Sequence, residues 1–201
     1  MKRTHLFNLL TIALSVSRFS VQAADSTSSP VMPRQTDGKG AVAISGESKQ
    51  WHKVTLTLDG PFAHERDTLP NPFTDLAFNV TFTHESGSPK YTVPGYFAAD
   101  GQAANSSAES GMKWLAHLSP DKTGRWTYKV SFTQGTNAAL DCGGQALKPF
   151  DGITGTFTIA ASDKTGRDFR SKGRLQYVGK HHLQFAGTKE YLAGQEIFCK
   201  I

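Results

Sequence analysis

The side chains of this 201-residue chain that could carry out acid–base chemistry are acidic residues in turn-like segments. Chemistry with paired carboxyl groups, such as the cleavage of a glycosidic bond, needs two of them about 5 to 9.5 Å apart on one cleft. The available carboxylates stand beside Gly, Pro, Thr or Ser, where Asp is usually a turn residue. They are Asp59, Asp67, Asp75, Asp100 and Glu109. The sequence therefore predicts no catalytic residue.

The histidines show no metal-binding spacing. Neither HxH nor HExxH occurs among His52, His64, His84 and His117, and His181-His182 stands in a predicted hairpin turn. Ser110 lacks the G-x-S-x-G frame of a nucleophile elbow. We expect no metal and no cofactor.

The cysteines are Cys142, in a Gly-rich loop, and Cys199, near the end of the chain. A disulfide is permitted in an exported protein, but their placement does not favour a Cys142–Cys199 bridge. We do not expect one.

Three aromatic residues could bind carbohydrate, because flat aromatic rings stack on the apolar faces of sugars. They are Trp51, Tyr96 and Trp114. If they form a binding site, they should make one flat strip that faces solvent. The alternative is that they pack under neighbouring loops, as a Trp at the start of a strand more often does.

The stretch 113–132 organises the elements that would position these residues. Its second half alternates, with Trp126, Tyr128, Val130 and Phe132 on one face and polar residues on the other. This period of two predicts a half-buried strand. Similar strands are expected at 51–58, 76–83, 91–97, 113–118 and 152–159, and an edge strand at 41–44. About seven short strands predict an all-β, immunoglobulin- or fibronectin-like antiparallel β-sandwich over residues 47–161.

The N-terminal residues 1–23 have the pattern of a secretory signal peptide: a basic start, a short apolar run and small residues ending at Ala23. The run is too short to span a membrane. Cleavage would lower the net charge from +5 to +2 by removing Lys2, Arg3 and Arg18. The remaining basic residues are mostly scattered, so nucleic-acid binding is not expected. Residues 24–46 are rich in Ser, Gly and Pro and predict a flexible leader.

After residue 161 the composition changes to charged residues punctuated by glycine, which is typical of a linker. Residues 175–178 and 183–185 flank Gly179-Lys-His-His and predict a small hairpin.

Long runs of the chain closely resemble a bacterial family, the N-terminal sandwich called domain of unknown function 5060. The runs are WHKVTLTLDGP (51–61), NPFTDLAFNVTFTH (71–84), YTVPGYFAADG (91–101), SGMKWLAHLSP (110–120), TGRWTYKVSF (123–132) and DKTGRDFRSKGRLQYVGKHHLQFAGTKEYL (163–192). In that family the sandwich precedes a (β/α)₈ barrel that resembles glycoside hydrolases. The resemblance therefore implies an exported bacterial protein, periplasmic or extracellular, and a non-catalytic accessory module for a carbohydrate-active barrel.

Residues 193–201 depart from the family pattern, and we expect residues 162–201 to be a linker and the truncated start of a missing barrel, through a frameshift or gene split near Leu192. No catalytic residue can then be carried over, so the chain itself is not expected to be an enzyme. A set of apolar residues would be left as an exposed barrel-packing surface: Phe169, Leu175, Tyr177, Leu183 and Phe185. The alternative is a free-standing, secreted carbohydrate-binding module that contacts polysaccharide.

Overall fold

The computed structural model describes residues 34–141, 143–179 and 181–192. The expected signal peptide, the first part of the expected leader, both cysteines and the last nine residues lie outside this part of the chain. None of the helices in the described ranges is long and apolar enough to cross a membrane.

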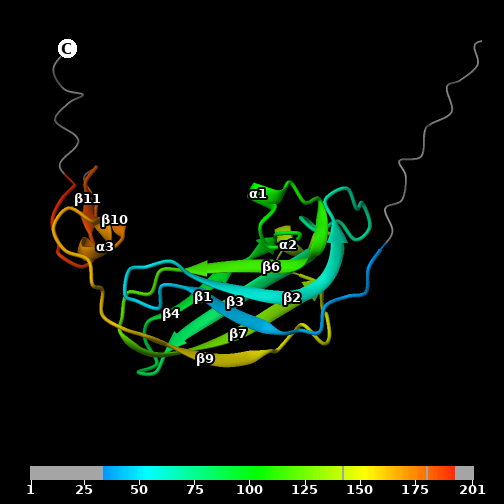
Figure 1. Cartoon of the computed structure of the whole chain (residues 1–201), viewed down its shortest axis with the longest axis horizontal. Coiled ribbons are helices and arrows are strands. Elements are labelled where there is room, and N and C mark those ends of the chain that lie inside the picture. The colour runs from blue at the N-terminus through cyan, green and yellow to red at the C-terminus, as the bar shows by residue number, and fades with distance from the viewer. Residues whose placement is uncertain (1–33, 142, 180, 193–201) are drawn as a thin grey trace, which may run out of the picture. The chain divides into compact units, whose positions relative to one another are not determined.

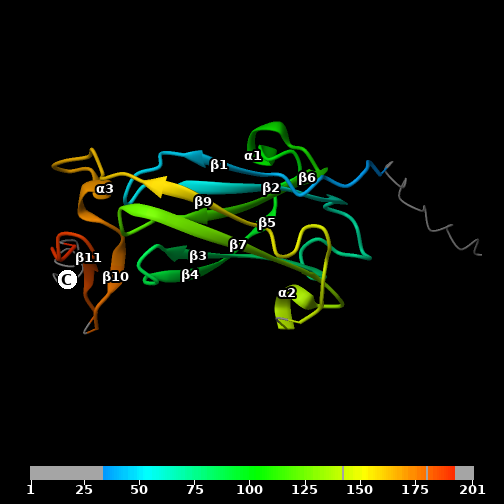
Figure 2. The ribbon, with the colours of Figure 1, turned by 90° about the horizontal axis from the view of Figure 1, so that it is seen from below.

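The described residues form two antiparallel sheets that pack face to face, with a separate hairpin after them (Figures 1 and 2). The first sheet has the order β1 (Val42–Gly46), β2 (Val54–His64), β6 (Ser110–Leu118), β5 (Tyr96–Phe97). The second has the order β4 (Lys90–Pro94), β3 (Leu76–His84), β7 (Gly124–Gln134), β8 (Gln145–Ala146), and β9 (Thr154–Ile159) also pairs with β7. The hairpin pairs β10 (Leu175–Tyr177) with β11 (Leu183–Phe185). The predicted all-β sandwich is confirmed.

Within the described ranges, three helices of four residues interrupt the loops: α1 (Ala103–Ser106), α2 (Ala138–Asp141) and α3 (Phe169–Lys172). The sequence predicted none of them, because a single turn is too short to show a helical period.

The core lies between the sheets and is built from alternate strand residues. On β7, Trp126, Val130 and Phe132 are fully buried. Trp114 of the other sheet meets Phe132 edge to face, with ring centroids 4.9 Å apart. The indole N–H of Trp114 donates to the Pro61 carbonyl at 3.0 Å, so its polar atom is satisfied within the core.

The chain changes sheets at Gly95. Residues 91–97, predicted as one strand, divide into β4, which pairs with β3, and β5, which pairs with β6. A Cβ atom at Gly95 would lie 2.2 Å from the Phe78 ring, so only glycine lets the backbone cross here. The two halves of the predicted strand therefore lie in different layers.

β2 is longer than predicted. The sequence Asp59-Gly60-Pro61 predicted its end, but the strand continues to His64 through a register shift between Asp59 and Ala63. A Cβ at Gly60 would lie 2.6 Å from the Trp114 ring, so the glycine makes room for the indole.

The sandwich begins before the expected boundary at residue 47. β1 pairs with β2 from Val42↔Leu58 to Gly46↔Val54, which confirms the edge strand expected at 41–44. Farther upstream, Arg34 donates to the Phe62 carbonyl at 2.7 Å. Residues 34–46 of the expected leader therefore lie against the sandwich.

Candidate functional site

The three aromatic residues predicted to form a sugar-binding strip do not lie on one surface. Trp114 is 1% exposed, because its side chain points between the sheets, and it cannot contact a ligand. Trp51 is half-buried, and a Cβ at Gly173 would lie 3.1 Å from its ring. Tyr96 is 48% exposed. The predicted strip is therefore wrong, because among these three residues Tyr96 alone is exposed.

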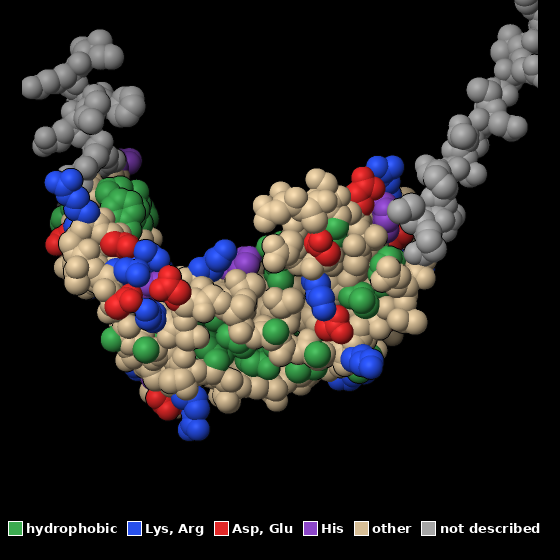
Figure 3. Space-filling view, viewed as in Figure 1, with side chains coloured by type: hydrophobic (Ala, Val, Ile, Leu, Met, Phe, Trp, Pro, Cys, Tyr) green, Lys and Arg blue, Asp and Glu red, His purple; other side chains and the backbone are tan. Residues whose placement is uncertain are grey.

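Tyr96 stands in an open groove of about 600 Å³ on the outer face of the β1-β2-β6-β5 sheet. Strand residues form its floor and the loop that carries α1 forms one wall, where the surface is hollowed beside α1 (Figure 3). The lining includes Thr55, Lys53, Asp100, Gln102 and His117.

A chain of hydrogen bonds fixes the Tyr96 ring in this groove. Its hydroxyl lies 3.0 Å from Nε2 of His117, and Nδ1 of His117 lies 2.9 Å from Oγ1 of Thr55. Partial burial, with a smaller effect of the Lys53 ammonium, lowers the pKa of His117. A neutral imidazole can bridge two hydroxyl groups, so the groove presents an anchored aromatic face among polar groups.

A second candidate surface lies on the segment after the sandwich. Its exposed apolar residues, which we call the hairpin patch, are Phe169, Leu175, Tyr177, Val178, Leu183 and Tyr191. Four of them were predicted, and Val178 and Tyr191 were missed. Figure 3 shows hydrophobic side chains gathered at the end of the molecule that carries β10 and β11.

Phe185 does not belong to this patch, contrary to the prediction. It is 3% exposed, its ring lies 5.4 Å from that of Phe169, and the Lys172 ammonium lies 5.5 Å from its centroid. Phe185 therefore forms the small core under the hairpin.

The hairpin segment is fastened to the sandwich by Arg174. Its guanidinium lies over the ring of Tyr91 at 5.1 Å, donates to the Tyr91 hydroxyl at 3.1 Å, and lies 3.6 Å from the Asp121 carboxylate. The Tyr91 hydroxyl also donates to Asp121. Burial, followed by this hydrogen bond to Asp121, raises the pKa of Tyr91.

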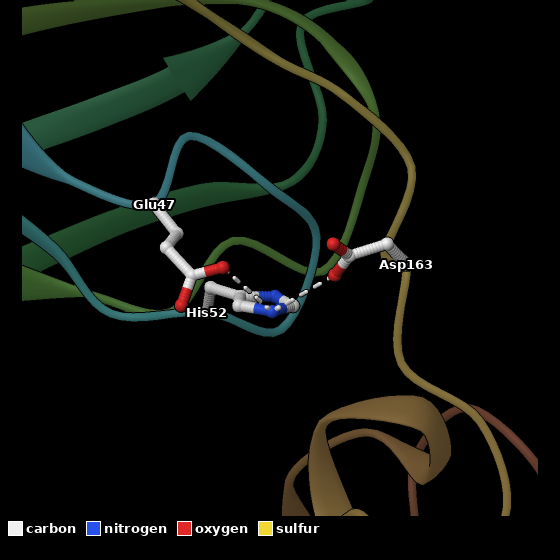
Figure 4. A group of neighbouring side chains, drawn as sticks. All are labelled: Glu47, His52 and Asp163. Carbon is white, nitrogen blue, oxygen red and sulfur yellow. Dashed lines mark ion pairs between the residues drawn. The ribbon is translucent and has the colours of Figure 1, made fainter.

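A second junction gathers Glu47, His52 and Asp163, which we call the junction cluster (Figure 4). Glu47 directly follows β1, His52 precedes β2, and Asp163 follows β9. Nε2 of His52 lies 3.5 Å from Oε2 of Glu47 and 3.8 Å from Oδ1 of Asp163. His52 is 1% exposed.

Basic side chains surround the junction cluster. Lys49 donates to Oδ2 of Asp163 at 2.6 Å, and Arg170 to Oε1 of Glu47 at 3.3 Å. The hydrogen bond from Lys49, reinforced by Lys164, lowers the pKa of Asp163 to about 2. Asp163 is therefore ionised at neutral pH.

Sequence spacing could not reveal this cluster. Glu47 and Asp163 are separated by more than a hundred residues, and a parallel bridge between Lys49 and Ala160 brings their segments together. A period or a motif reports only neighbours along the chain, whereas this contact depends on how β9 returns beside the β1–β2 loop.

Comparison with known proteins identifies the sandwich. Residues 47–133 match the family described as Domain of unknown function (DUF5060). This segment resembles the DUF5060 family, and the match covers 87 of the 201 residues. The match runs from the β1–β2 loop through β7, so it includes most of both sheets and the groove around Tyr96. No curated protein matches the chain.

Among solved structures, the chain is similar to the crystal structure of a putative glycoside hydrolase from Bacteroides vulgatus ATCC 8482. The two are 22% identical, with a TM-score of 0.43, and the alignment covers 71% of this chain. It covers 20% of the other chain, so this protein corresponds to about a fifth of the length of that one.

Proposed function

We propose that this protein is a non-catalytic accessory module of a carbohydrate-active enzyme of glycoside-hydrolase type. In that role the sandwich is a rigid body, and the segment that carries α3, β10 and β11 provides the surface on which a catalytic domain packs. The long runs that resemble the family, from Trp51 to Leu192, support this proposal.

The observation that carries the packing role is the hairpin patch. Phe169, Tyr177 and Tyr191 are each more than 60% exposed, within a segment that is itself fastened to the sandwich through Arg174. Contiguous exposed apolar groups of this kind mark interaction sites. A fastened segment also loses little conformational entropy when a partner docks, which favours binding.

The experiment measures self-association by light scattering. It compares the chain without residues 1–23 with its Phe169→Ser, Tyr177→Ser double variant. The hairpin patch should make the parent chain self-associate in solution, and the double variant should be monomeric. The matched control is Tyr96→Ser, which removes an exposed aromatic group from the groove and should associate like the parent. Equal monodispersity of parent and double variant would contradict the packing role.

A second candidate function is carbohydrate binding by the groove, because it holds an anchored, half-exposed aromatic ring among polar groups. Under this proposal soluble oligosaccharides bind to the chain, and Tyr96→Ala weakens binding about tenfold or more, since a stacked ring contributes on the order of 1 to 2 kcal/mol. Tyr177→Ala, an exposed tyrosine on the hairpin, should leave the affinity unchanged. Equal affinities of the two variants for oligosaccharide would exclude the groove as the carbohydrate-binding site.

The non-catalytic part of the proposal is tested with the same oligosaccharides. The chain should release no reducing sugar from any of them over days, and reproducible hydrolysis by the pure protein would overturn it.

We further propose that the protein is exported through its first 23 residues, on the pattern of charge, apolar run and small residues described above. Mass spectrometry of the protein from a bacterial periplasm should give a chain that begins at Ala24. A chain that retains Met1 in the cytoplasm would exclude export.

A further inference from the structure

The hydrogen bonding of His52 leaves one of its ring nitrogens in an unusual position. Nδ1 lies 2.8 Å from the carbonyl oxygen of Gln50. A carbonyl can only accept, so Nδ1 carries the proton and, in the neutral ring, Nε2 is a bare lone pair. Nε2 is buried without a hydrogen-bond partner and faces Glu47 and Asp163 (Figure 4).

The other two buried histidines of the described residues differ from His52 in which nitrogen carries the proton, although Nε2 of His64 also lacks a hydrogen-bond partner. His64 accepts from the Arg66 backbone N–H at Nδ1, so its Nε2 carries the proton toward the nearby Glu109 carboxylate. His84 has the Thr123 carbonyl at 2.9 Å from Nε2, which therefore donates. Among these three, His52 alone points a lone pair at carboxylate oxygens. Such an arrangement is repulsive unless a proton on Nε2 or a metal cation lies between the atoms.

The two carboxylates are also oriented for a shared cation. Glu47 uses Oε1 for Arg170 and turns Oε2 to His52, while Asp163 uses Oδ2 for Lys49 and turns Oδ1 to His52. The Lys49 ammonium also lies 3.6 Å from Oε2 of Glu47, so it must move aside when an ion binds there. One ligand atom from each of the three residues lies within 4.8 Å of the others. In a tetrahedral zinc site with bonds near 2.0 Å, ligand atoms are about 3.3 Å apart. The distances of 3.5 and 3.8 Å from Nε2 come close to that spacing.

The backbone holds both segments of the cluster in place. The N–H of Gln50 donates to the Ala160 carbonyl at 2.8 Å, and the N–H of Ala160 donates to the Ser48 carbonyl at 2.9 Å. The Gln50 carbonyl also fixes the His52 ring through its contact with Nδ1. A hydrogen bond of this kind commonly orients a metal-binding imidazole.

We propose that Glu47, His52 and Asp163 bind a divalent transition-metal ion of the zinc type. One imidazole and two carboxylates suit Zn²⁺, with water completing the coordination. The ion would join the β1–β2 loop to the segment after β9, and so would brace the hairpin segment against the sandwich. This inference does not depend on the proposed carbohydrate-related function.

The Lys164 ammonium competes with the ion for two of the proposed ligand atoms. Its ammonium lies 3.4 Å from Oδ1 of Asp163 and 4.0 Å from Oε2 of Glu47, the same two oxygens that face His52. Its side chain is partly exposed and can swing into solvent, but its charge opposes a second cation. Removing this charge should therefore strengthen metal binding, which no purely structural role of Lys164 would produce.

The test is calorimetric titration of the untagged, EDTA-treated full chain with Zn²⁺, followed by Co²⁺ as a spectroscopic probe. We expect one strong site, with visible Co²⁺ bands typical of a four-coordinate ion. His52→Gln should weaken Zn²⁺ binding about tenfold or more, and Lys164→Gln should tighten it severalfold. His64→Gln, a buried histidine that also faces a carboxylate, is the matched control and should bind like the parent.

Three results would overturn the proposal: no Zn²⁺ binding by the parent, unchanged binding by folded His52→Gln, or weaker binding by Lys164→Gln. If His52→Gln does not fold, NMR of the unaltered protein with Co²⁺ locates the binding site instead. Co²⁺ should broaden the NMR signals of residues 47–52 and 163 first, and broadening confined to other histidines would exclude this site.

Discussion

At the scale of single residues, the fold depends on positions where a side chain would collide with the core. Gly95 is the clearest case, because a Cβ there would lie 2.2 Å from the Phe78 ring and 2.8 Å from the Leu115 carbonyl oxygen. The chain passes between the sheets at this residue, so neither neighbour can move without disturbing a strand.

We predict that Gly95→Ala lowers the free energy of unfolding by about 2 to 3 kcal/mol, as overpacking of a core does. Urea denaturation monitored by tryptophan fluorescence measures it. The matched control is Gly143→Ala, where an added Cβ meets nothing within 4 Å, and the change should be within about 0.5 kcal/mol. Equal stability of the two variants would show that the backbone crosses the layers without needing glycine.

Asp75 gives a residue-scale prediction on pH. Its carboxylate accepts from the backbone N–H groups of Asn71 and Asn137 at 3.0 and 3.1 Å, and these bonds lower its pKa. A lowered pKa in the folded state adds stability that is fully present above the unfolded value near 4. That stability is lost as the pH falls through the lower, folded value.

The urea midpoint of the parent should therefore fall more steeply than that of Asp75→Asn as the pH drops from 5 to 3. The amide keeps the shape of the carboxyl group but does not titrate, so Asp75→Asn is the matched control for the parent protein. Parallel curves for the two proteins would mean that Asp75 does not link stability to pH.

At the scale of elements, the segment after β9 is ordered through a few side chains rather than through a large core. Asp168 caps helix α3 with its carboxylate, which accepts from the Arg170 N–H, and among the described strands β10 pairs with β11 alone. Arg174 carries the contact with Tyr91 and Asp121 on the sandwich. Elements with so few buried contacts open locally at low cost in free energy.

Arg174→Ala should accordingly raise hydrogen exchange in residues 175–185 severalfold and leave the exchange of β3 and β7 unchanged. The reason is that Arg174 contacts Tyr91 on the edge strand β4 and Asp121 in the β6–β7 turn, whereas β3 and β7 are held by their own pairing and by the main core. Arg167→Ala removes an arginine from the same segment, seven residues earlier, and should not alter exchange in the hairpin. Uniformly faster exchange after Arg174→Ala would instead make this arginine part of the global fold.

At the scale of the whole molecule, the main core belongs to the sandwich alone. Its buried cluster comes from residues 54–159, and the hairpin has its own small core around Phe185. A β-sandwich of this size can bury enough apolar surface to fold by itself.

A chain that ends at Ser162 should therefore unfold in one cooperative transition, with nearly the melting temperature of the full chain and without self-association. Differential scanning calorimetry and light scattering measure both properties. A non-cooperative melt would mean that the hairpin segment is required for the sandwich to fold.

The sequence by itself determined the sandwich and most of its strands. Strict alternation around Trp126, Val130 and Phe132 can satisfy burial in only one way, because a shift of one residue would turn the apolar face to solvent. The DUF5060 resemblance, carried by long ordered runs, also followed from the sequence and is confirmed over residues 47–133. Four members of the hairpin patch were identified in the same way.

Only the tertiary structure decided which residues meet across the chain. It buried Trp114 between the sheets and Phe185 against Phe169 of α3, although both were predicted at candidate surfaces, Trp114 as a flat aromatic ring and Phe185 from the family resemblance. It also brought Asp163 beside His52, because β9 runs back to the β1–β2 loop. Local patterns specify which face of a strand is apolar, but not which distant segment covers it, since that depends on the packing of the complete set of strands.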